Sequence, residues 1–433
     1  MDTLFLGVGR HAITPEVGCR LFGYTPDIYS ESVADDLNAT VFYFQQSDRR
    51  CLMISLDVCS FEDLFAKQLF EQIEKEFGIP GNACIMSAIH THSGPALNGI
   101  VGWGDPDYTY IETIFIPGVM TAVKKALAHP VAAEMGWSCG ESLVGVNRRQ
   151  LNLNNTISLG QNPWGPFEPR MRLISFRDLQ GKCLANLVHY GAHATAAGKN
   201  HEISRDWPGV MIDALEAHTG GITAFFNGPE GDVGPRLSNG DTVGNMHYVR
   251  ELGAVAAEDA IRIYNKIDQY NTPQLRICEH SITIPLQPRM PPEEARTLYE
   301  QYKDCTTNMS AYRAATALAA LQAHENGIPN EAQRHFSQNM IQLNNLIFVS
   351  SPFELFSEIG MRIDREFPEH QVMNIINANG SHGYVVTQDA ICRGGYEVRY
   401  HLYRQPQPFC DDADGVIVTQ TVKNIQTMLS KED

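Results

Sequence analysis

The order of apolar segments between residues 51 and 89 limits the folds that this chain can adopt. Residues 51–57 and 84–89 are short apolar runs with the character of buried strands. Between them, residues 62–77 carry apolar side chains at helical spacing (Leu64, Phe65, Leu69, Phe70, Ile73 and Phe77). A strand, a helix and a second strand in this order are typical of a layered α/β domain. We therefore predict a mixed β-sheet core covered by helices.

Similar patterns extend over the rest of the chain. Strands are expected at residues 4–8, 39–45, 133–138, 171–176, 184–188, 222–226, 274–286 and 345–349. Helices are expected at 108–129, with a bend at Pro117, and at 246–267, 292–326, 355–366 and 413–430. Because we find no internal repeat and no low-complexity linker, residues 1–433 are expected to form a single catalytic domain with a helical excursion at about 290–330.

The charge balance argues against several partners. Lys and Arg total 33 and Asp and Glu total 50, which gives a net charge of −17. Such a field repels nucleic acid and anionic lipid surfaces. No apolar run is long enough to span a bilayer, so membrane insertion is not expected. A small-molecule substrate remains the expected partner, and a homo-oligomer stays open.

The cysteines and the N-terminus bear on location. The ten cysteines are scattered and include no Cys-x-x-Cys pair, which fits free thiols in a reducing compartment. Residues 1–10 lack the pattern of a secretion signal. A cytoplasmic location is therefore expected.

The second apolar run ends in an unusual sequence, His90-Thr91-His92-Ser93-Gly94-Pro95. If strand geometry persists through Thr91, the side chains of His90 and His92 share one face. Two imidazoles that enter one cavity favour a metal site or a proton-transfer site. The alternative is a pair of buried structural histidines.

Other apolar runs also end in polar residues. The run at 184–188 is followed by His189, His193 and His201, and the sequence alone does not decide which of them faces a site. After residues 222–226, a loop rich in Gly and Pro carries Glu230 and Asp232, which are candidates for acid–base chemistry or for the hydrogen bonding of turn amides.

Three further residues are candidates for the same site. Glu354 follows the run at 345–349 and is either a metal ligand or an acid at the start of a helix. Arg148 lies in a long polar segment that runs from Gly145 through Pro169, and it could clamp a carbonyl or carboxylate, or lie solvated at the surface. The donor atoms that zinc prefers would come from these strand ends, namely from His90 or His92, His193, Glu354 and Tyr384.

With these residues the chain resembles the neutral ceramidases, zinc amidases that cleave the N-acyl bond of ceramide. The motifs that carry the resemblance are Gly7-Val8-Gly9-Arg10, Ile13-Thr14-Pro15, the segment from His90 to Pro95, Asn147-Arg148, the loop from His193 to Ser204, Gly231-Asp232-Val233, Pro352-Phe353-Glu354, Tyr384 and Gly395-Tyr396-Glu397. The resemblance implies the layered α/β catalytic domain of that family. The immunoglobulin-like domain that ends the ceramidases is expected to be absent.

The resemblance also implies roles for particular residues. His90, His193, Glu354 and Tyr384 match the zinc ligands, so the resemblance prefers His193 to His189. His92, Arg148 and Tyr396 match groups around the scissile amide.

The chain departs from the family pattern at one chemically important position. Gly234 stands where ceramidases carry a serine that is regarded as the nucleophile. Glycine has no side chain that could attack a carbonyl, so a serine mechanism at this position is excluded. We expect Gly234 to widen the pocket beside the metal, and this departure and the expected location argue against ceramide as the substrate.

The expected function is that of a zinc-dependent hydrolase with one ion per chain, although manganese or iron would accept the same donors. A metal-bound hydroxide would attack an amide or ester carbonyl of a small soluble substrate, for instance an N-acyl compound. His92 would move a proton, Arg148 or Tyr396 would stabilise the oxyanion, and Asp232 is a further catalytic candidate. The alternative is a non-hydrolytic relative, either a metal-dependent lyase or isomerase that acts on a sugar or related metabolite, or a binding protein.

Overall fold

A computed structural model describes residues 2–99, 104–305 and 308–430 of the chain. The larger sheet of this described part has eight strands in the order β13-β11-β10-β6-β1-β3-β4-β5. Their bounds are β1 Phe5–Ala12, β3 Asn38–Gln46, β4 Arg49–Leu56, β5 Cys84–Ala88, β6 Val131–Glu141, β10 Arg170–Asp178, β11 Cys183–Tyr190 and β13 Ile222–Asn227. The strands at both ends of this order run parallel to their neighbours, and the other pairs are antiparallel. The predicted α/β class with a mixed sheet is therefore confirmed.

Two crossover helices make the parallel pairs at the sheet ends. Helix α1 (Asp63–Phe77) joins β4 to β5, and α4 (Asp206–Thr219) lies between β11 and β13. The two end strands approach each other, because the Nδ2 group of Asn227, the last residue of β13, donates a hydrogen bond to the carbonyl oxygen of Ile89, which follows β5 (3.1 Å). The loops that follow β5, β11 and β13 consequently meet at one place.

A second sheet of four strands has the order β15-β16-β17-β19. Its bounds are β15 Leu275–Pro285, β16 Gln333–Leu343, β17 Leu346–Ser350 and β19 Gln371–Ile375, and α8 (Ser357–Arg365) connects the parallel pair β17 and β19. The segment between β17 and α8 forms the short strand β18 (Glu354–Leu355), which pairs in parallel with β20 (Tyr384–Val385). This small pair brings Glu354 directly opposite Tyr384.

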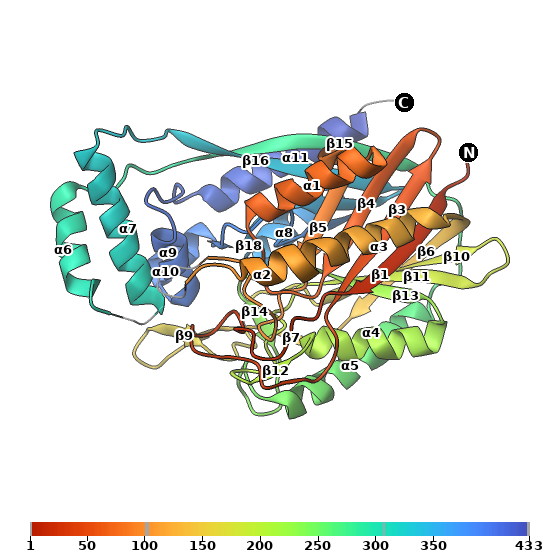
Figure 1. Ribbon diagram of the computed structural model, residues 1–433, viewed down its shortest axis with the longest axis horizontal. Coiled ribbons are helices and arrows are strands. Elements are labelled where there is room, and N and C mark those ends of the chain that lie inside the picture. Colours follow the sequence, from red (N-terminus) through yellow and green to blue (C-terminus); the bar gives the residue numbers. More distant parts are fainter. Residues whose placement is uncertain (1, 100–103, 306–307, 431–433) are drawn as a thin grey trace.

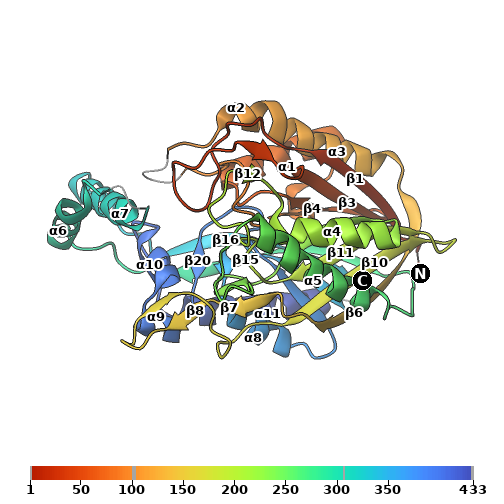
Figure 2. The ribbon, with the colours of Figure 1, turned by 90° about the horizontal axis from the view of Figure 1, so that it is seen from below.

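Helices cover the sheets on several sides (Figure 1). Helix α3 (Ile116–Ala128) packs on β1 and β3, α5 (Met246–Tyr264) packs on β6 and β10, and α11 (Ala413–Ser430) packs on β15. Helices α6 (Pro292–Tyr302) and α7 (Asn308–Glu325) extend from one end of the molecule in both views (Figure 2). The remaining helices are α2 Tyr108–Tyr110, α9 Gln388–Arg393 and α10 Tyr396–Tyr403. None of the helices in the described ranges is long and apolar enough to cross a membrane.

Two expected helices differ in detail from the structure. The region 292–326 forms two helices, α6 and α7, rather than one. In the region 108–129 the irregularity lies before Pro117, as a π-helical turn at Ile111–Phe115. A proline has no amide proton and its ring collides with the carbonyl four residues earlier, and the wider π turn accommodates both constraints.

Close packing of α3 on β1 depends on two glycines. A Cβ atom at Gly7 would lie 1.8 Å from the carbonyl oxygen of Ala126, and one at Gly9 would lie 2.1 Å from that of Ala122. Because both obstacles are backbone atoms of α3, any side chain at these positions would displace the helix from the sheet.

Candidate metal centre

His90 reaches the centre through a sharp turn at the end of β5. Its φ angle is 69°, so the strand stops before this residue and the expectation that His90 and His92 share a face through strand geometry is wrong. The two imidazoles nevertheless meet, with their Nε2 atoms 3.2 Å apart. The Nδ1–H group of His90 donates to the carbonyl oxygen of Cys59 (2.8 Å), which leaves Nε2 available as a ligand atom.

His193 is held in the same way after β11. Its Nδ1–H group lies 2.9 Å from the carbonyl oxygen of Glu230 and 3.0 Å from that of Val233. These backbone acceptors fix the tautomer and direct the Nε2 atom into the centre. His189, the other candidate on this strand, instead hydrogen-bonds through Nε2 with the carbonyl oxygen of Asn374. The structure therefore brings His193, and not His189, to the centre.

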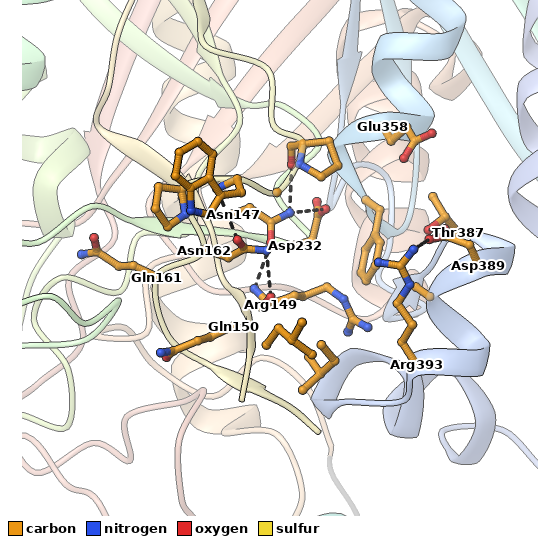
Figure 3. Close-up of a pocket in the computed structure, with 18 of the residues that line it drawn as sticks. Asn147, Arg149, Gln150, Gln161, Asn162, Asp232, Glu358, Thr387, Asp389 and Arg393 are labelled. Atoms are coloured by element: carbon orange, nitrogen blue, oxygen red, sulfur yellow. Dashed lines mark hydrogen bonds and ion pairs between the residues drawn. The ribbon is translucent and has the colours of Figure 1, made fainter. Parts of the chain in front are cut away.

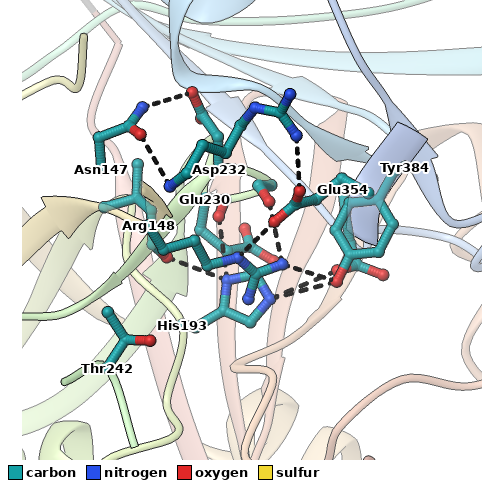
Figure 4. Close-up of polar contacts among 12 residues, drawn as sticks. Asn147, Arg148, His193, Glu230, Asp232, Thr242, Glu354 and Tyr384 are labelled. Carbon is teal, nitrogen blue, oxygen red and sulfur yellow. Dashed lines mark hydrogen bonds and ion pairs between the residues drawn. The ribbon is translucent and has the colours of Figure 1, made fainter. Parts of the chain in front are cut away.

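Glu354 lies between the two imidazoles. Its Oε2 atom is 3.5 Å from Nε2 of His90 and 3.5 Å from Nε2 of His193. Figure 4 shows Glu354 together with His193 and Tyr384. Within the described residues, this oxygen has no hydrogen-bond partner although its side chain is buried. An ionised carboxylate oxygen that is buried without a partner is costly, and a cation at this place would remove the cost.

Glu230 adds a second carboxylate at the centre. One ligand atom each from His90, His193, Glu230 and Glu354 lie within 4.8 Å of one another. The Oε1 atom of Glu230 accepts a hydrogen bond from Nδ2 of Asn377 (3.1 Å), whereas its fully buried Oε2 atom has no partner among the described residues. Two unpaired carboxylate oxygens thus face two imidazole nitrogens.

Tyr384 completes this side of the centre. Its hydroxyl group is 3.5 Å from Nε2 of His193 and accepts a hydrogen bond from Nη2 of Arg148 (3.0 Å). The Nε atom of Arg148 is in turn paired with Glu397 at 2.9 Å. Burial and the neighbouring Glu354 carboxylate raise the pKa of Tyr384 well above its usual value, so the phenol stays protonated unless a cation compensates its charge.

Burial sets the protonation of the other groups. It lowers the pKa of His193 to about 3 and also lowers the pKa values of His90 and His92, so the imidazoles are neutral as ligation requires. Burial and the Glu354 charge raise the pKa of Glu230.

The remaining predicted residues lie at different distances from this cluster. His92 is half-buried and packs edge-on against Tyr24, with ring centroids 4.9 Å apart. Tyr396 begins α10, and its ring centroid is 5.9 Å from the guanidinium carbon of Arg148. Both residues border the centre without belonging to the four-donor group.

Asp232 has a different environment from Glu230. Its Oδ1 atom accepts a hydrogen bond from the amide of Ser357 (2.7 Å), and its Oδ2 atom accepts one from Nδ2 of Asn147 (3.0 Å). The carboxylate therefore ties the Gly- and Pro-rich loop to the start of α8. Figure 3 shows Asp232 and Asn147 at the wall of a neighbouring cavity.

Gly234 does not widen the centre, so that expectation is wrong. A Cβ atom at this position would lie 2.7 Å from Cβ of Thr242 and 3.4 Å from Cβ of Arg148. The space next to Gly234 is thus filled by the buried Thr242 side chain, which a sequence pattern cannot reveal.

Sequence reasoning missed some members of the site. Glu230 and Asp232 were both candidates in the loop after β13, and no pattern in the sequence shows that Glu230 is the one that reaches the centre. Asn377 follows β19 and touches both Glu230 and His90, so its signal is the same as for the histidines, namely a polar residue after a buried strand. Glu397, which holds Arg148, follows Tyr396 in a motif already singled out for the resemblance.

Comparisons with known proteins give the fold. The structure is similar to that of neutral ceramidase from Pseudomonas aeruginosa, with a TM-score of 0.77 and 18% sequence identity over 99% of this chain and 75% of that one. A ceramidase complexed with C2 matches with a TM-score of 0.76 and 18% identity over the same shares. No family model matches the sequence, and no curated protein is similar to it at a significant level. The chain therefore has a neutral ceramidase-like fold, and the resemblance is confirmed at that level.

Proposed function

We propose that this protein is a metal-dependent hydrolase that cleaves an amide or ester bond in a small substrate. The observation that carries the proposal is the buried group of His90, His193, Glu230 and Glu354. Within the part of the chain that the structure describes, the Oε2 atom of each of the two carboxylates has no hydrogen-bond partner. The neutral ceramidase-like fold supports the same reaction class, because the similar structures are those of ceramidases.

The donor set fits one divalent transition metal ion. Imidazole nitrogens and carboxylate oxygens are ligands that zinc, manganese and iron accept in proteins. His90, His193 and Glu354 would hold the ion, with Tyr384 as a further ligand and Glu230 as an adjacent carboxylate. Such an ion, when bound, polarises a carbonyl group and makes water acidic enough to ionise near neutral pH.

The side chains around this group have separate tasks in the proposal. Arg148 and Tyr396 hold the carbonyl oxygen of the substrate and stabilise negative charge that develops on it. Glu397 is a positioning residue, because it fixes the guanidinium of Arg148 at 2.9 Å. Half-buried His92, whose Nδ1 atom has no partner in the described part of the chain, passes a proton between substrate and solvent.

Asp232 acts in the proposal as a positioning residue rather than as an acid or base. Its backbone carbonyl oxygen accepts a hydrogen bond from the amide of Arg148 (2.8 Å). Its carboxylate accepts a hydrogen bond from the side chain of Asn147, the residue before Arg148. No serine nucleophile is involved, since residue 234 is glycine. The proposed substrate is a soluble N-acyl compound or ester rather than ceramide.

The cysteines support a cytoplasmic location as part of the proposal. All ten lie within the described residues and are free thiols. Three of them are buried, namely Cys51, Cys59 and Cys84. A chain of this kind suits a reducing compartment.

The test combines metal analysis with a substrate screen. Elemental analysis of the purified protein should give about one transition metal ion per chain, and the His90→Ala variant should lose it. The metal-loaded protein should then hydrolyse at least one member of a panel of N-acyl amino acids, N-acetylated sugars, esters and lactones, with C2-ceramide as the comparison. A metal-loaded protein that turns over a sugar without hydrolysis would instead support the lyase or isomerase alternative.

A further inference from the structure

A cavity of about 970 Å³ lies beside the candidate metal centre. It is bounded by the hairpin of β8 (Arg149–Leu151) and β9 (Ile157–Leu159), by residues 161–166 and by α9 (Figure 3). Its volume is within the range of roughly 300–1,000 Å³ that small-molecule sites occupy.

The cavity is separate from the metal centre because consecutive residues face opposite ways. Arg148 contacts Tyr384 and Glu397 on the side of the centre, whereas Asn147 and Arg149 line the cavity. One extended segment of chain, β7 (Gly145–Asn147) followed by β8, thus forms a wall between the two spaces.

The walls of the cavity are already fixed by hydrogen bonds. The Nδ2 group of Asn147 donates to the carbonyl oxygen of Pro166 (2.9 Å), and that of Asn162 donates to the carbonyl oxygen of Arg149 (3.0 Å). The Nη2 atom of Arg149 donates to the carbonyl oxygen of Gly394 (2.6 Å). These bonds connect the loop, the hairpin and the end of α9, so a ligand would not have to order these segments.

The charges in the cavity do not favour an anion. Arg149 is paired with Glu397 at 2.8 Å, and Arg393 is paired with Asp389 at 3.1 Å. Glu358 adds another carboxylate to the lining. Both positive charges are therefore compensated, and a phosphate or carboxylate would meet net negative charge.

An exposed tryptophan stands at this cavity. Trp164 is 93% exposed, whereas Trp207 in the core is fully buried. A large apolar ring left in water at the edge of a polar cavity is typical of a binding surface, because it loses water only when a ligand covers it. Leu151, which is 64% exposed, lines the same cavity.

The polar groups nearby can still form hydrogen bonds. The exposed Gln150 and the half-buried Glu358 line the cavity from opposite sides, as Figure 3 shows. A neutral ligand that has an apolar face for the indole and hydroxyl groups for amides and carboxylates matches this combination. A pyranose ring has both features.

We propose that this cavity is a carbohydrate-binding site, in which one sugar ring stacks on Trp164 and the hydroxyl groups of the ligand form hydrogen bonds with polar side chains of the lining. The site does not depend on the proposed hydrolase activity. It takes a neutral sugar, and its size leaves room for more than one ring.

Isothermal titration calorimetry of the full chain with a panel of neutral disaccharides tests the site. The panel contains maltose, cellobiose, lactose, xylobiose, mannobiose and N,N′-diacetylchitobiose. At least one of them should bind with a Kd of about 10 mM or lower. Trp164→Ala should weaken that binding at least about tenfold, because the stacking surface is lost.

Two control variants locate the binding. Leu153→Ala removes another exposed apolar side chain, from the turn between β8 and β9 and outside the cavity lining, and should leave the affinity unchanged. Glu354→Gln alters the metal centre and should also leave it unchanged. The proposal is overturned if no disaccharide binds, if Trp164→Ala binds as tightly as the wild type, or if Glu354→Gln abolishes binding.

Discussion

The Nε2 atom of His193 lies 3.5 Å from the Oε2 atom of Glu354, although the two residues follow strands of different sheets. His193 follows β11 of the larger sheet, and Glu354 follows β17 of the smaller one. The candidate metal centre is thus built at the junction of the two sheets. An ion at this place would connect them and would add its binding free energy to the stability of the folded state.

Replacing each carboxylate by the corresponding amide should distinguish the roles of Glu230 and Asp232 in the loop after β13. Glu230→Gln should lower metal affinity about 10–100-fold, because a carboxylate next to the ion is lost. Asp232→Asn should leave metal affinity nearly unchanged and lower the free energy of unfolding by about 1–3 kcal/mol, because its new NH₂ group meets the Nδ2 donor of Asn147. Chelator competition and urea unfolding measure the two quantities. If Asp232→Asn lowered metal affinity and Glu230→Gln did not, Asp232 rather than Glu230 would be the carboxylate beside the ion.

Restoring a serine at residue 234 should harm the protein. In Gly234→Ser the new Cβ atom would lie 2.7 Å from Cβ of Thr242, which should cost about 1–3 kcal/mol without raising turnover. Combining it with Thr242→Gly should recover part of that loss, and a double-mutant cycle measures the coupling. A Gly234→Ser protein as stable as the wild type would contradict this packing.

Two glycine substitutions should have opposite effects on stability. Gly9→Ala should cost about 3 kcal/mol, because its Cβ atom would lie 2.1 Å from the carbonyl oxygen of Ala122 in α3. Gly415→Ala in α11 meets no atom closer than 4.0 Å and should add about 0.5–1 kcal/mol, because alanine favours the helix. Thermal or urea unfolding of both variants is the measurement. Equal effects at the two positions would argue against the close contact of α3 with β1.

The buried carboxyl of Asp57 should make stability depend on pH. Burial raises its pKa from 3.8 to about 6, so folding favours the protonated acid. The contribution of Asp57 to the free energy of unfolding should therefore be fully present below about pH 4. It should be lost as the pH rises through about 6, which lowers the free energy of unfolding by about 3 kcal/mol in total. Asp57→Asn removes the titration and keeps an oxygen that can accept from the amide of Asn38. Between about pH 4 and about pH 7, the free energy of unfolding of the wild type should fall relative to that of Asp57→Asn. Parallel pH profiles of the two proteins would contradict the raised pKa of Asp57.

The layered fold could be predicted from the sequence because its elements leave local patterns. The apolar runs at 51–57 and 84–89 became β4 and β5, and the helical spacing between them became α1. The histidines and Glu354 were found because polar residues follow buried strands. This rule depends only on the approximate place where an apolar run ends, which the sequence shows directly.

The rest depends on tertiary contacts that have no local pattern. The left-handed turn at His90 breaks the two-residue period on which its pairing with His92 was predicted. Glu230 and Asp232 are two residues apart in a loop rich in Gly and Pro, where no strand period tells which one points to the centre. The filling of the space at Gly234 comes from Thr242, and only the folded chain brings these residues together.

The most direct test of the metal centre is calorimetric titration of metal-free protein with Zn²⁺, repeated for Glu354→Gln and for the control Glu358→Gln. We expect the wild type and Glu358→Gln to bind about one ion per chain, and Glu354→Gln to bind it at least about 100-fold more weakly. Glu358 is a matched control, because it lies on α8 and faces the neighbouring cavity instead of the centre. Equal zinc binding by all three proteins, or none by the wild type, would contradict a metal centre built on Glu354.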